Sequence, residues 1–349
     1  MVANFAQNSE YWNEQHSITP RLHYSNQFEV AFVPKTKPIP LDGVKSYPLK
    51  ERSSKVGIDD FGRPWTSGGN LKSWIQALPK ILAGNDFRQV VDHIVRAVRS
   101  GNIIILAMGA HPIKVGLNPV ILDLMDRGII AGLAMNGACI VHDTELAMVG
   151  HTSEDVAAQI RDGRFGMAEE TGKFLNEAII EGANRDDGLG RAIGNMLIRE
   201  KFPFTQHSLV AKAVEMDIPL TVHVAIGTDI IHFHPSVDGA AIGKTSHLDF
   251  RLFASLVSEL EGGVFINLGS AVIMPEVFLK ALSLVRNLGH KVQKFTTVNM
   301  DFMQHYRPVT NVVQRPTLEG GEGYSLVGHH EIMFPLLASA VIEGLEAKG

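Results

Sequence analysis

Histidine is the residue type in this sequence with the clearest potential for chemistry, because 15 of the 349 residues are histidines. His232 and His234 are two residues apart, so in a strand both imidazoles would point to one face and could bind a metal ion together. No HExxH motif or other strong zinc pattern accompanies this pair. We therefore favour hydrogen-bonded histidines in a polar cleft or an interface, and keep a metal site at His232 and His234 as the alternative.

Small and polar residues follow several apolar runs of the sequence, at places where a nucleotide could bind. These candidate cofactor-binding residues are Gly109, His111, Asn136, Gly137, Thr228, Gly269, Ser270, Ala271 and Asp301. Small residues let backbone N–H groups approach a pyrophosphate, and a helix N-terminus favours its negative charge. The GxGxxG fingerprint of dinucleotide-binding proteins is absent, so glycines that only make tight turns are an equally good interpretation.

The elements that would position these residues are strands and helices in alternation. Short apolar runs typical of buried parallel strands lie at residues 102–110, 129–138, 219–228, 262–271 and 294–302. Amphipathic stretches that predict helices lie at residues 73–84, 86–101, 118–128, 153–162, 166–181, 189–199, 206–216, 246–260, 275–289 and 334–347. Asp86 is the expected N-cap of the second of these helices.

Because strand, glycine and helix recur in this order, we expect an α/β fold with a doubly wound, mostly parallel sheet and helices on both of its faces. Ligands of such sheets bind beyond the carboxyl ends of the strands, near the point where the strand order switches. The candidate cofactor-binding residues follow the predicted strands, so they are expected at that edge.

The composition argues against several classes of protein. The sum of 32 Lys+Arg and 37 Asp+Glu gives a net charge of −5, so we expect no basic surface for nucleic acid. No run reaches the roughly 18 apolar residues of a membrane span. Cys139 is the single cysteine and cannot form an internal disulfide, and the first residues lack the features of a secretory signal. Together these features favour a cytoplasmic location.

The first 70 residues differ from the rest of the chain. They are rich in proline and aromatic residues and show little helical or strand periodicity. We expect an extended N-terminal arm over residues 1–70 and a Rossmann-like domain over residues 71–349. An apolar arm needs a surface to cover, on its own core or on a neighbouring subunit, which predicts a homo-oligomer.

Four blocks of the sequence, in this order, resemble the deoxyhypusine synthase family. They lie at residues 106–143, 218–235, 262–289 and 334–345, within a region of similarity that spans about residues 85–345. The resemblance implies an NAD-binding fold in which Asp229 is an acidic residue of the active-site cleft. It also places Gly269, Ser270 and Ala271 in the glycine-rich turn that binds NAD. Members of that family are tetramers with sites at subunit interfaces.

The sequence departs from that family where its chemistry needs an amine. The family passes an aminobutyl group through an imine on a lysine between the last strands and the terminal helix, but no lysine occurs here between Lys294 and Lys348. Arg307 and Arg315 lie in this stretch instead, and arginine suits a carboxylate or phosphate. We therefore do not expect aminobutyl transfer, and we expect a small, anionic substrate.

The leading hypothesis is a cytoplasmic NAD-dependent oxidoreductase or transferase. Asp229 and His223 would be its acid and base, since a carboxylate beside an imidazole tunes the pKa of both groups, and Arg307 or Arg315 would orient the substrate. One alternative is a metal-dependent hydrolase or lyase that uses His232 and His234. The other is an NAD-binding oligomer without catalysis.

Overall fold

The computed structural model of the protein describes residues 34–346. Residues 1–33 of the expected N-terminal arm therefore lie outside the described residues. The chain divides into two compact units, of which the first ends at Ser54 and the second begins at Lys55. Residues 34–54 contain one short 3-10 helix, η1 (Leu49–Glu51), and most of their side chains are exposed. All strands described below belong to the second unit.

The second unit is built on one parallel sheet of six strands, which confirms the α/β fold expected from the sequence. The strands are β1 (Ile104–Met108), β2 (Gly132–Asn136), β3 (Leu220–His223), β4 (Val264–Leu268), β5 (Thr296–Asp301) and β6 (Glu322–Val327). Their order across the sheet is β3-β2-β1-β4-β5-β6. Met108 of β1 pairs with Met135 of β2 and with Leu268 of β4, so these strands end at the same level.

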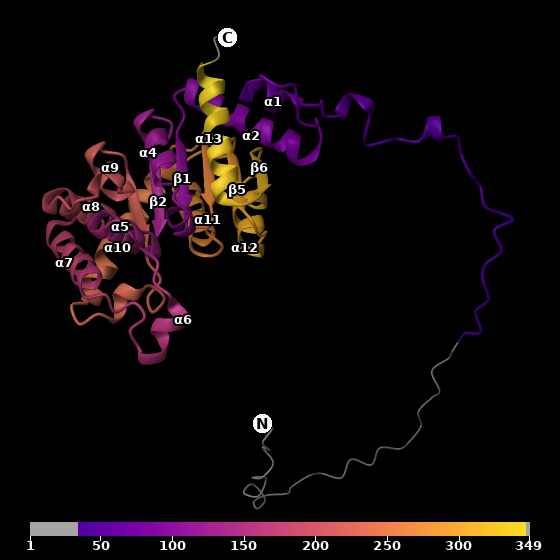
Figure 1. Ribbon diagram of the computed structural model, residues 1–349. Helices are drawn as coiled ribbons and strands as arrows, with labels where there is room; N and C mark the ends of the chain where they lie inside the picture. Colours follow the sequence, from indigo (N-terminus) through magenta and orange to yellow (C-terminus); the bar gives the residue numbers. More distant parts are fainter. Residues whose placement is uncertain (1–33, 347–349) are drawn as a thin grey trace, which may run out of the picture. The chain divides into compact units, whose positions relative to one another are not determined.

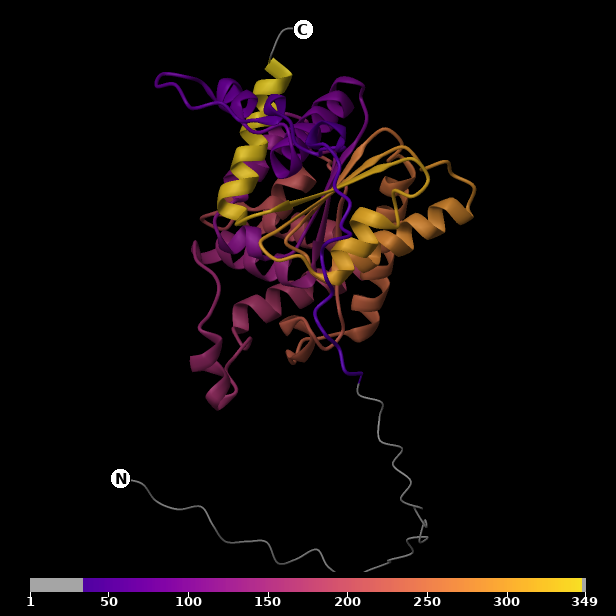
Figure 2. The ribbon, with the colours of Figure 1, turned by 90° about the vertical axis from the view of Figure 1, so that its right-hand side faces the viewer.

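Helices cover both faces of this sheet, as expected for a doubly wound fold (Figures 1 and 2). They are α1 (Leu71–Ala77), α2 (Leu82–Arg99), α3 (His111–Lys114), α4 (Asn118–Asp126), α5 (Gly137–Val149), α6 (Val156–Gln159), α7 (Glu169–Arg185), α8 (Leu189–Glu200), α9 (Leu209–Glu215), α10 (Gly239–Ser258), α11 (Ile273–Asn287), α12 (Tyr306–Pro308) and α13 (His330–Glu346). Shorter helical turns are η2 (Ile58–Asp60), η3 (Ile160–Asp162), η4 (Thr205–His207), η5 (Ile230–Phe233) and the π-helical η6 (Val309–Gln314). Across residues 34–346, no helix has both the length and the apolar character that crossing a membrane requires.

The alternation of side chains along β1 separates two hydrophobic cores. Leu106 and Met108 face a large core that α2, α4 and α13 share with α5 and α7–α9, whereas Ile105 and Ala107 face a smaller core under α10 and α11. Phe265 and Phe278 stack at the centre of the smaller core, with ring centroids 3.8 Å apart. A central strand that is apolar on both faces is what the sequence predicted for residues 102–110.

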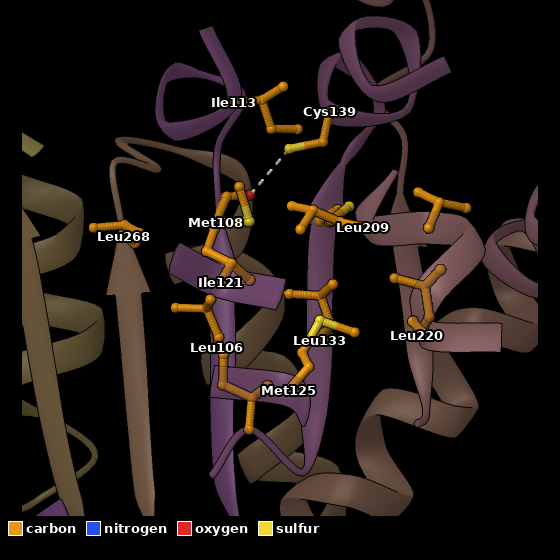
Figure 3. Close-up of a cluster of buried hydrophobic side chains, with 14 of the residues drawn as sticks. Leu106, Met108, Ile113, Ile121, Met125, Leu133, Cys139, Leu209, Leu220 and Leu268 are labelled. Carbon is orange, nitrogen blue, oxygen red and sulfur yellow. Dashed lines mark hydrogen bonds between the residues drawn. The ribbon is translucent and has the colours of Figure 1, made fainter. Parts of the chain in front are cut away.

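Cys139 belongs to the larger core (Figure 3). It lies in the first turn of α5, and its thiol donates a hydrogen bond of 3.6 Å to the carbonyl oxygen of Met108. Burial raises the pKa of this thiol, so it stays protonated. Cys139 is therefore a core residue and no nucleophile.

Five details of the secondary structure differ from the sequence prediction. The helix expected over residues 73–84 is broken after Ala77, and α2 begins at Leu82, so Asp86 lies inside α2 and does not cap it. Arg88 donates hydrogen bonds to the carbonyl oxygens of residues 75, 78 and 79 and so stabilises this break. α10 begins at Gly239, where the Asp238 side chain accepts hydrogen bonds from two backbone N–H groups. The sequence analysis also missed α5 and the edge strand β6.

Buried carboxylates hold helix N-termini in the large core. Asp249 of α10 is fully buried and accepts hydrogen bonds from the backbone N–H of Gly190 in α8 (2.9 Å) and of Val222 in β3 (2.8 Å). Burial raises the pKa of Asp249 to about 7. One side chain thus joins three elements of the fold.

We expect the variant Asp249→Ala to lower the free energy of unfolding by about 3 kcal/mol, because two buried N–H groups lose their acceptor. Asp249→Asn keeps an acceptor oxygen and should lose less. The folded pKa of Asp249 lies above the unfolded value of 3.8, so its stabilising contribution is complete below about pH 4 and is lost as the pH rises through about 7. Urea titrations should therefore show a smaller loss of unfolding free energy in Asp249→Asn, relative to the wild type, at pH 8 than at pH 5. An equal loss at both pH values would contradict this account.

Candidate functional site

The candidate site begins where the strand order reverses. The chain runs from β1 to β2 and β3 on one side and from β4 to β5 and β6 on the other, so β1 and β4 flank the switch point. In sheets of this order, ligands bind at the carboxyl ends of the strands beside the switch point. Gly109 follows β1 and Gly269 follows β4, so the structure places both predicted glycines at this position.

The loops after β1 and β4 touch through their backbones. The N–H of Gly109 donates to the carbonyl oxygen of Leu268 (3.1 Å), and a Cβ at residue 109 would lie 2.5 Å from the carbonyl oxygen of Gly269. Gly269 has a φ of +67°, and a Cβ there would lie 2.9 Å from the imidazole of His330. Only glycine fits both positions without a shift of the surrounding atoms.

Ser270 and Ala271 complete the turn that leads into α11. The hydroxyl of Ser270 accepts a hydrogen bond from the N–H of Met274 (3.1 Å), and its side chain is buried. Beneath the turn, the Asn267 side chain donates to the carbonyl oxygen of Ser270 (3.0 Å) and to the side-chain oxygen of Asn299 (2.8 Å). The turn at the N-terminus of α11 is therefore held in place from below by buried amides.

A cluster of rings lies beside this turn, at the ends of β1 and β5. The rings of His111 and His330 are 5.2 Å apart, and both lie within about 6 Å of Phe302. The Nε2 of His330 lies 3.2 Å from the carbonyl oxygen of Met300 and 3.8 Å from the carboxylate of Asp301. Burial, and then the neighbouring His330, lower the pKa of His111. Of this cluster, the sequence had singled out His111 and Asp301 as cofactor-binding residues.

A cavity of about 300 Å³ lies at the carboxyl ends of β2 and β3. Its lining includes three predicted residues, Asn136, Thr228 and Asp229. Asn136 caps α5 by accepting a hydrogen bond from the N–H of Cys139 (3.2 Å). The carboxylate of Asp229 lies against Gly137, where a Cβ would come within 2.3 Å of it, and accepts a hydrogen bond from the N–H of Ala225 (2.9 Å). Burial raises the pKa of Asp229.

His223 is not a partner of Asp229. Its Nε2 lies 3.0 Å from the hydroxyl of Thr221, its ring packs edge-on against Phe253, and burial lowers its pKa to about 4. No hydrogen bond joins His223 to Asp229 within the described residues. The pairing expected from the sequence is absent, and His223 is a buried, neutral side chain at the end of β3.

Arg307 and Arg315 lie together but away from this cavity. The guanidinium of Arg307 is 3.4 Å from the carboxylate of Glu276, and that of Arg315 donates to the Asn311 side chain (2.9 Å), which in turn donates to Glu276 (2.8 Å). Neither arginine is among the residues that line the cavity beside Asp229. Arg307 joins α12 to α11, Asn311 joins η6 to α11, and Arg315 holds the Asn311 side chain.

His232 and His234 do not form the expected pair on a strand. His232 lies in the 3-10 helix η5 and His234 directly follows it, because β3 ends at His223. The Nε2 of buried His234 lies 2.8 Å from the carbonyl oxygen of Gly166, and the Nδ1 of His232 accepts a hydrogen bond from the N–H of Gly227 (3.3 Å). Over residues 34–346, no cluster of three or more metal-ligating side chains is found. The strand geometry on which the metal alternative depended is therefore wrong.

The cavity also contains side chains that the sequence analysis did not include among the site residues. Those with titratable side chains are Lys114, His142, Glu145 and Glu154. Lys114 ends α3, and His142 and Glu145 lie three residues apart on α5, on one face of the helix. The spacing of His142 and Glu145 could have indicated a shared helix face, but the sequence analysis did not predict a helix over residues 137–149.

No family model and no curated protein matches the chain. Solved structures similar to it include the cyanobacterial arginine dihydrolase ArgZ, with 17% identity and a TM-score of 0.45 over 75% of this chain. A LOR/SDH protein from Methanococcus maripaludis S2 has 14% identity and a TM-score of 0.48, covering 76% of this chain and 71% of its own. A protein from Entamoeba histolytica assigned as a deoxyhypusine synthase has 13% identity and a TM-score of 0.47, covering 81% of this chain and 96% of its own.

The match spans 32% of the length of the arginine dihydrolase. These similarities do not assign the chain to a family. Its function is therefore to be inferred from the geometry of the site.

We expect Gly109→Ala to lower the free energy of unfolding by about 2 kcal/mol, because the new methyl group meets a backbone oxygen that cannot rotate away. Gly243→Ala is the matched control, since a Cβ at that position in α10 meets nothing within 4 Å and a helix interior favours alanine. Urea denaturation measures both. Equal effects of the two substitutions would show that the β1 and β4 loops are not in contact.

Proposed function

We propose that this chain binds NAD at the carboxyl edge of its sheet and is an NAD-dependent oxidoreductase or transferase acting on a small molecule. The observation that carries the proposal is the backbone contact between Gly109 and Gly269 at the switch point of a sheet with the order 3-2-1-4-5-6. A side chain at either position would collide with the protein itself, so the two loops can meet at the edge where dinucleotides bind only because both residues are glycine.

The residues present at this edge fit a dinucleotide. The turn of Gly269, Ser270 and Ala271 leads into α11, a helix of 15 residues whose N-terminus favours the negative charge of a pyrophosphate. The Oδ1 of Asp301 accepts a hydrogen bond from the N–H of Phe302 (2.8 Å), and a carboxylate has further acceptor sites for ribose hydroxyls. His111 lies beside them. When bound, NAD supplies an acceptor for hydride.

The cavity beside Asp229 is the proposed substrate site. Its volume of about 300 Å³ suits a small molecule, and it is lined by residues from α3, α5 and the loop after β3. Its wall contains Asp229, which the sequence analysis predicted to be catalytic, and Asn136, which it predicted to bind the cofactor. Because Arg307 and Arg315 do not line this cavity, Lys114 replaces them in the proposal as the cation for an anionic substrate.

Two observations shape the choice of reaction. The segment between β5 and β6 has no lysine, so an imine carrier is missing there and we do not propose aminobutyl transfer. Asp229 and His142 line a cavity next to the proposed NAD site, which favours catalysis over NAD binding alone. A protein that binds NAD and turns over no substrate would support the non-catalytic alternative.

We expect NAD to raise the melting temperature of the protein, with a stabilisation of about 2.7 kcal/mol at about 100 times the dissociation constant. Ala271→Trp should abolish this shift, because a large side chain would fill the turn before α11. Ser270 is unsuitable for this test because its hydroxyl holds the first turn of α11. Leu318→Trp, at a position that is 80% exposed, is the matched control. If calorimetry detects no heat with millimolar NAD or NADH on ligand-free protein, the assignment of the cofactor is wrong.

We also propose that the protein is a homo-oligomer, a tetramer by its resemblance to deoxyhypusine synthases. Large apolar side chains between residues 39 and 61 are more than half exposed, for example Ile39 at 84% and Ile58 at 80%. Such side chains need a surface to cover, which a second copy of the chain would supply. Light scattering at micromolar concentration should give a multiple of the monomer mass of 38.1 kDa. A monomer mass would refute the proposal.

A further inference from the structure

His142 is linked to Glu145 through the hydroxyl of Thr152. His142 and Glu145 lie on α5, and Thr152 lies in the segment that joins α5 to α6. The Nδ1 of His142 is 2.7 Å from the hydroxyl oxygen of Thr152, and that hydroxyl makes a short hydrogen bond to the Glu145 carboxylate. The other carboxylate oxygen of Glu145 accepts a hydrogen bond from the Thr171 hydroxyl (3.1 Å). We call His142, Thr152 and Glu145 the relay.

The relay fixes which nitrogen of His142 carries the proton. A threonine hydroxyl has one hydrogen, and here it is donated to the carboxylate of Glu145, which can only accept. The hydroxyl oxygen of Thr152 must therefore accept a hydrogen bond from the Nδ1–H of His142. The Nε2 is then the nitrogen with the free lone pair, and no group within residues 34–346 donates a hydrogen bond to it. His142 lines the cavity that also contains Asp229.

Lys114 is the one lysine or arginine in the lining of the cavity, which also includes the carboxylates of Asp229, Glu145 and Glu154. Each of these carboxylates already accepts a hydrogen bond from a neutral N–H or O–H group of the chain. Lys114 makes no ion pair or side-chain hydrogen bond within the described residues. An anionic group on the substrate would therefore find its partner in Lys114.

Lys114 is also close enough to His142 to affect its protonation. Burial, and then the charge of Lys114, lower the pKa of His142 to about 4. The imidazole is therefore neutral at physiological pH, and its lone pair is available. An anion that binds Lys114 would offset the positive charge and raise the pKa of His142, so the substrate itself would make the base stronger.

We propose that His142 is the base that removes the proton from the substrate, with Thr152 and Glu145 as positioning residues, and that the substrate is an alcohol that carries a carboxylate or another anionic group. This inference rests on the proposed function, because NAD is the oxidant. In the reaction, the carbon that bears the hydroxyl would give a hydride, with its two electrons, to bound NAD. The hydroxyl proton goes to the Nε2 of His142, and the C–O bond becomes a carbonyl. The chain of hydrogen bonds to Glu145 stabilises the imidazolium that forms.

The first test is NMR of the full-length protein labelled with ¹⁵N-histidine, with the His142 signals assigned from their loss in His142→Gln. We expect the tautomer protonated at Nδ1 and no titration between pH 8 and pH 5. Lys114→Met should raise the pKa of His142, and Thr152→Val should release the tautomer. Thr144→Val is the matched control, since the buried Thr144 hydroxyl has no partner among the described residues. A wild-type His142 protonated at Nε2 would overturn the relay, whether or not NAD binds.

The second test measures reduction of NAD at 340 nm with lactate, glycerate, malate and 3-hydroxybutyrate as probes. We expect turnover of at least one probe, a kcat at least about 100-fold lower for His142→Gln, and an unchanged thermal shift with NAD. Thr152→Val should lower kcat about 10-fold, and Thr152→Ser should restore it. Lys114→Met should raise KM for the probe more than it lowers kcat. Unchanged kcat in His142→Gln, or NAD binding without turnover of any probe, would overturn the inference, whereas a protein that does not bind NAD would overturn the proposed function.

Discussion

The contact between the backbones of Gly109 and Gly269 is the constraint on which the site depends. It joins the two halves of the sheet at the point where the chain reverses its direction of winding, and it leaves no room for a β-carbon on either loop. The turn into α11, the ring cluster around His330 and the amides beneath Ser270 are all arranged around it. The proposed cofactor position is thus defined by main-chain atoms.

Buried carboxylates connect the helices of the fold to one another and to the sheet. Asp249 ties α10 to α8 and β3. Asp143 accepts hydrogen bonds from the N–H groups of Leu209 (2.9 Å) and Val210 (3.2 Å) at the start of α9, and from the Asn118 side chain (3.1 Å). Asp143 directly follows His142, so the anchor of α5 and the proposed base are neighbours in the chain. The hydrogen bonds of Asp143 thereby anchor α5 next to His142, which lines the cavity.

The sequence predicted the fold class and five of the six strands because buried parallel strands are continuous apolar runs. It missed β6 because this strand is only partly buried and is not a continuous apolar run. It placed Gly109, Gly269 and Asp229 at the correct edge, since residues after parallel strands must meet there. It could not pair His142 with Thr152, because that contact depends on how the chain turns after α5. The sequence analysis also expected His223 and Asp229 to be partners, which the structure does not show, because closeness in sequence gives no information on the direction of a side chain.

The position of the single cysteine makes its reaction with thiol reagents a measure of local opening at α5. Cys139 is buried at the junction of β1 and α5, and its thiol is held by a carbonyl oxygen of the central strand (Figure 3). A thiol reagent can reach it only when α5 separates from the sheet, so the rate of labelling measures the free energy of that local opening. Since Asn136 caps α5 and His142 lies on it, the same rate records how often the wall of the proposed substrate cavity opens.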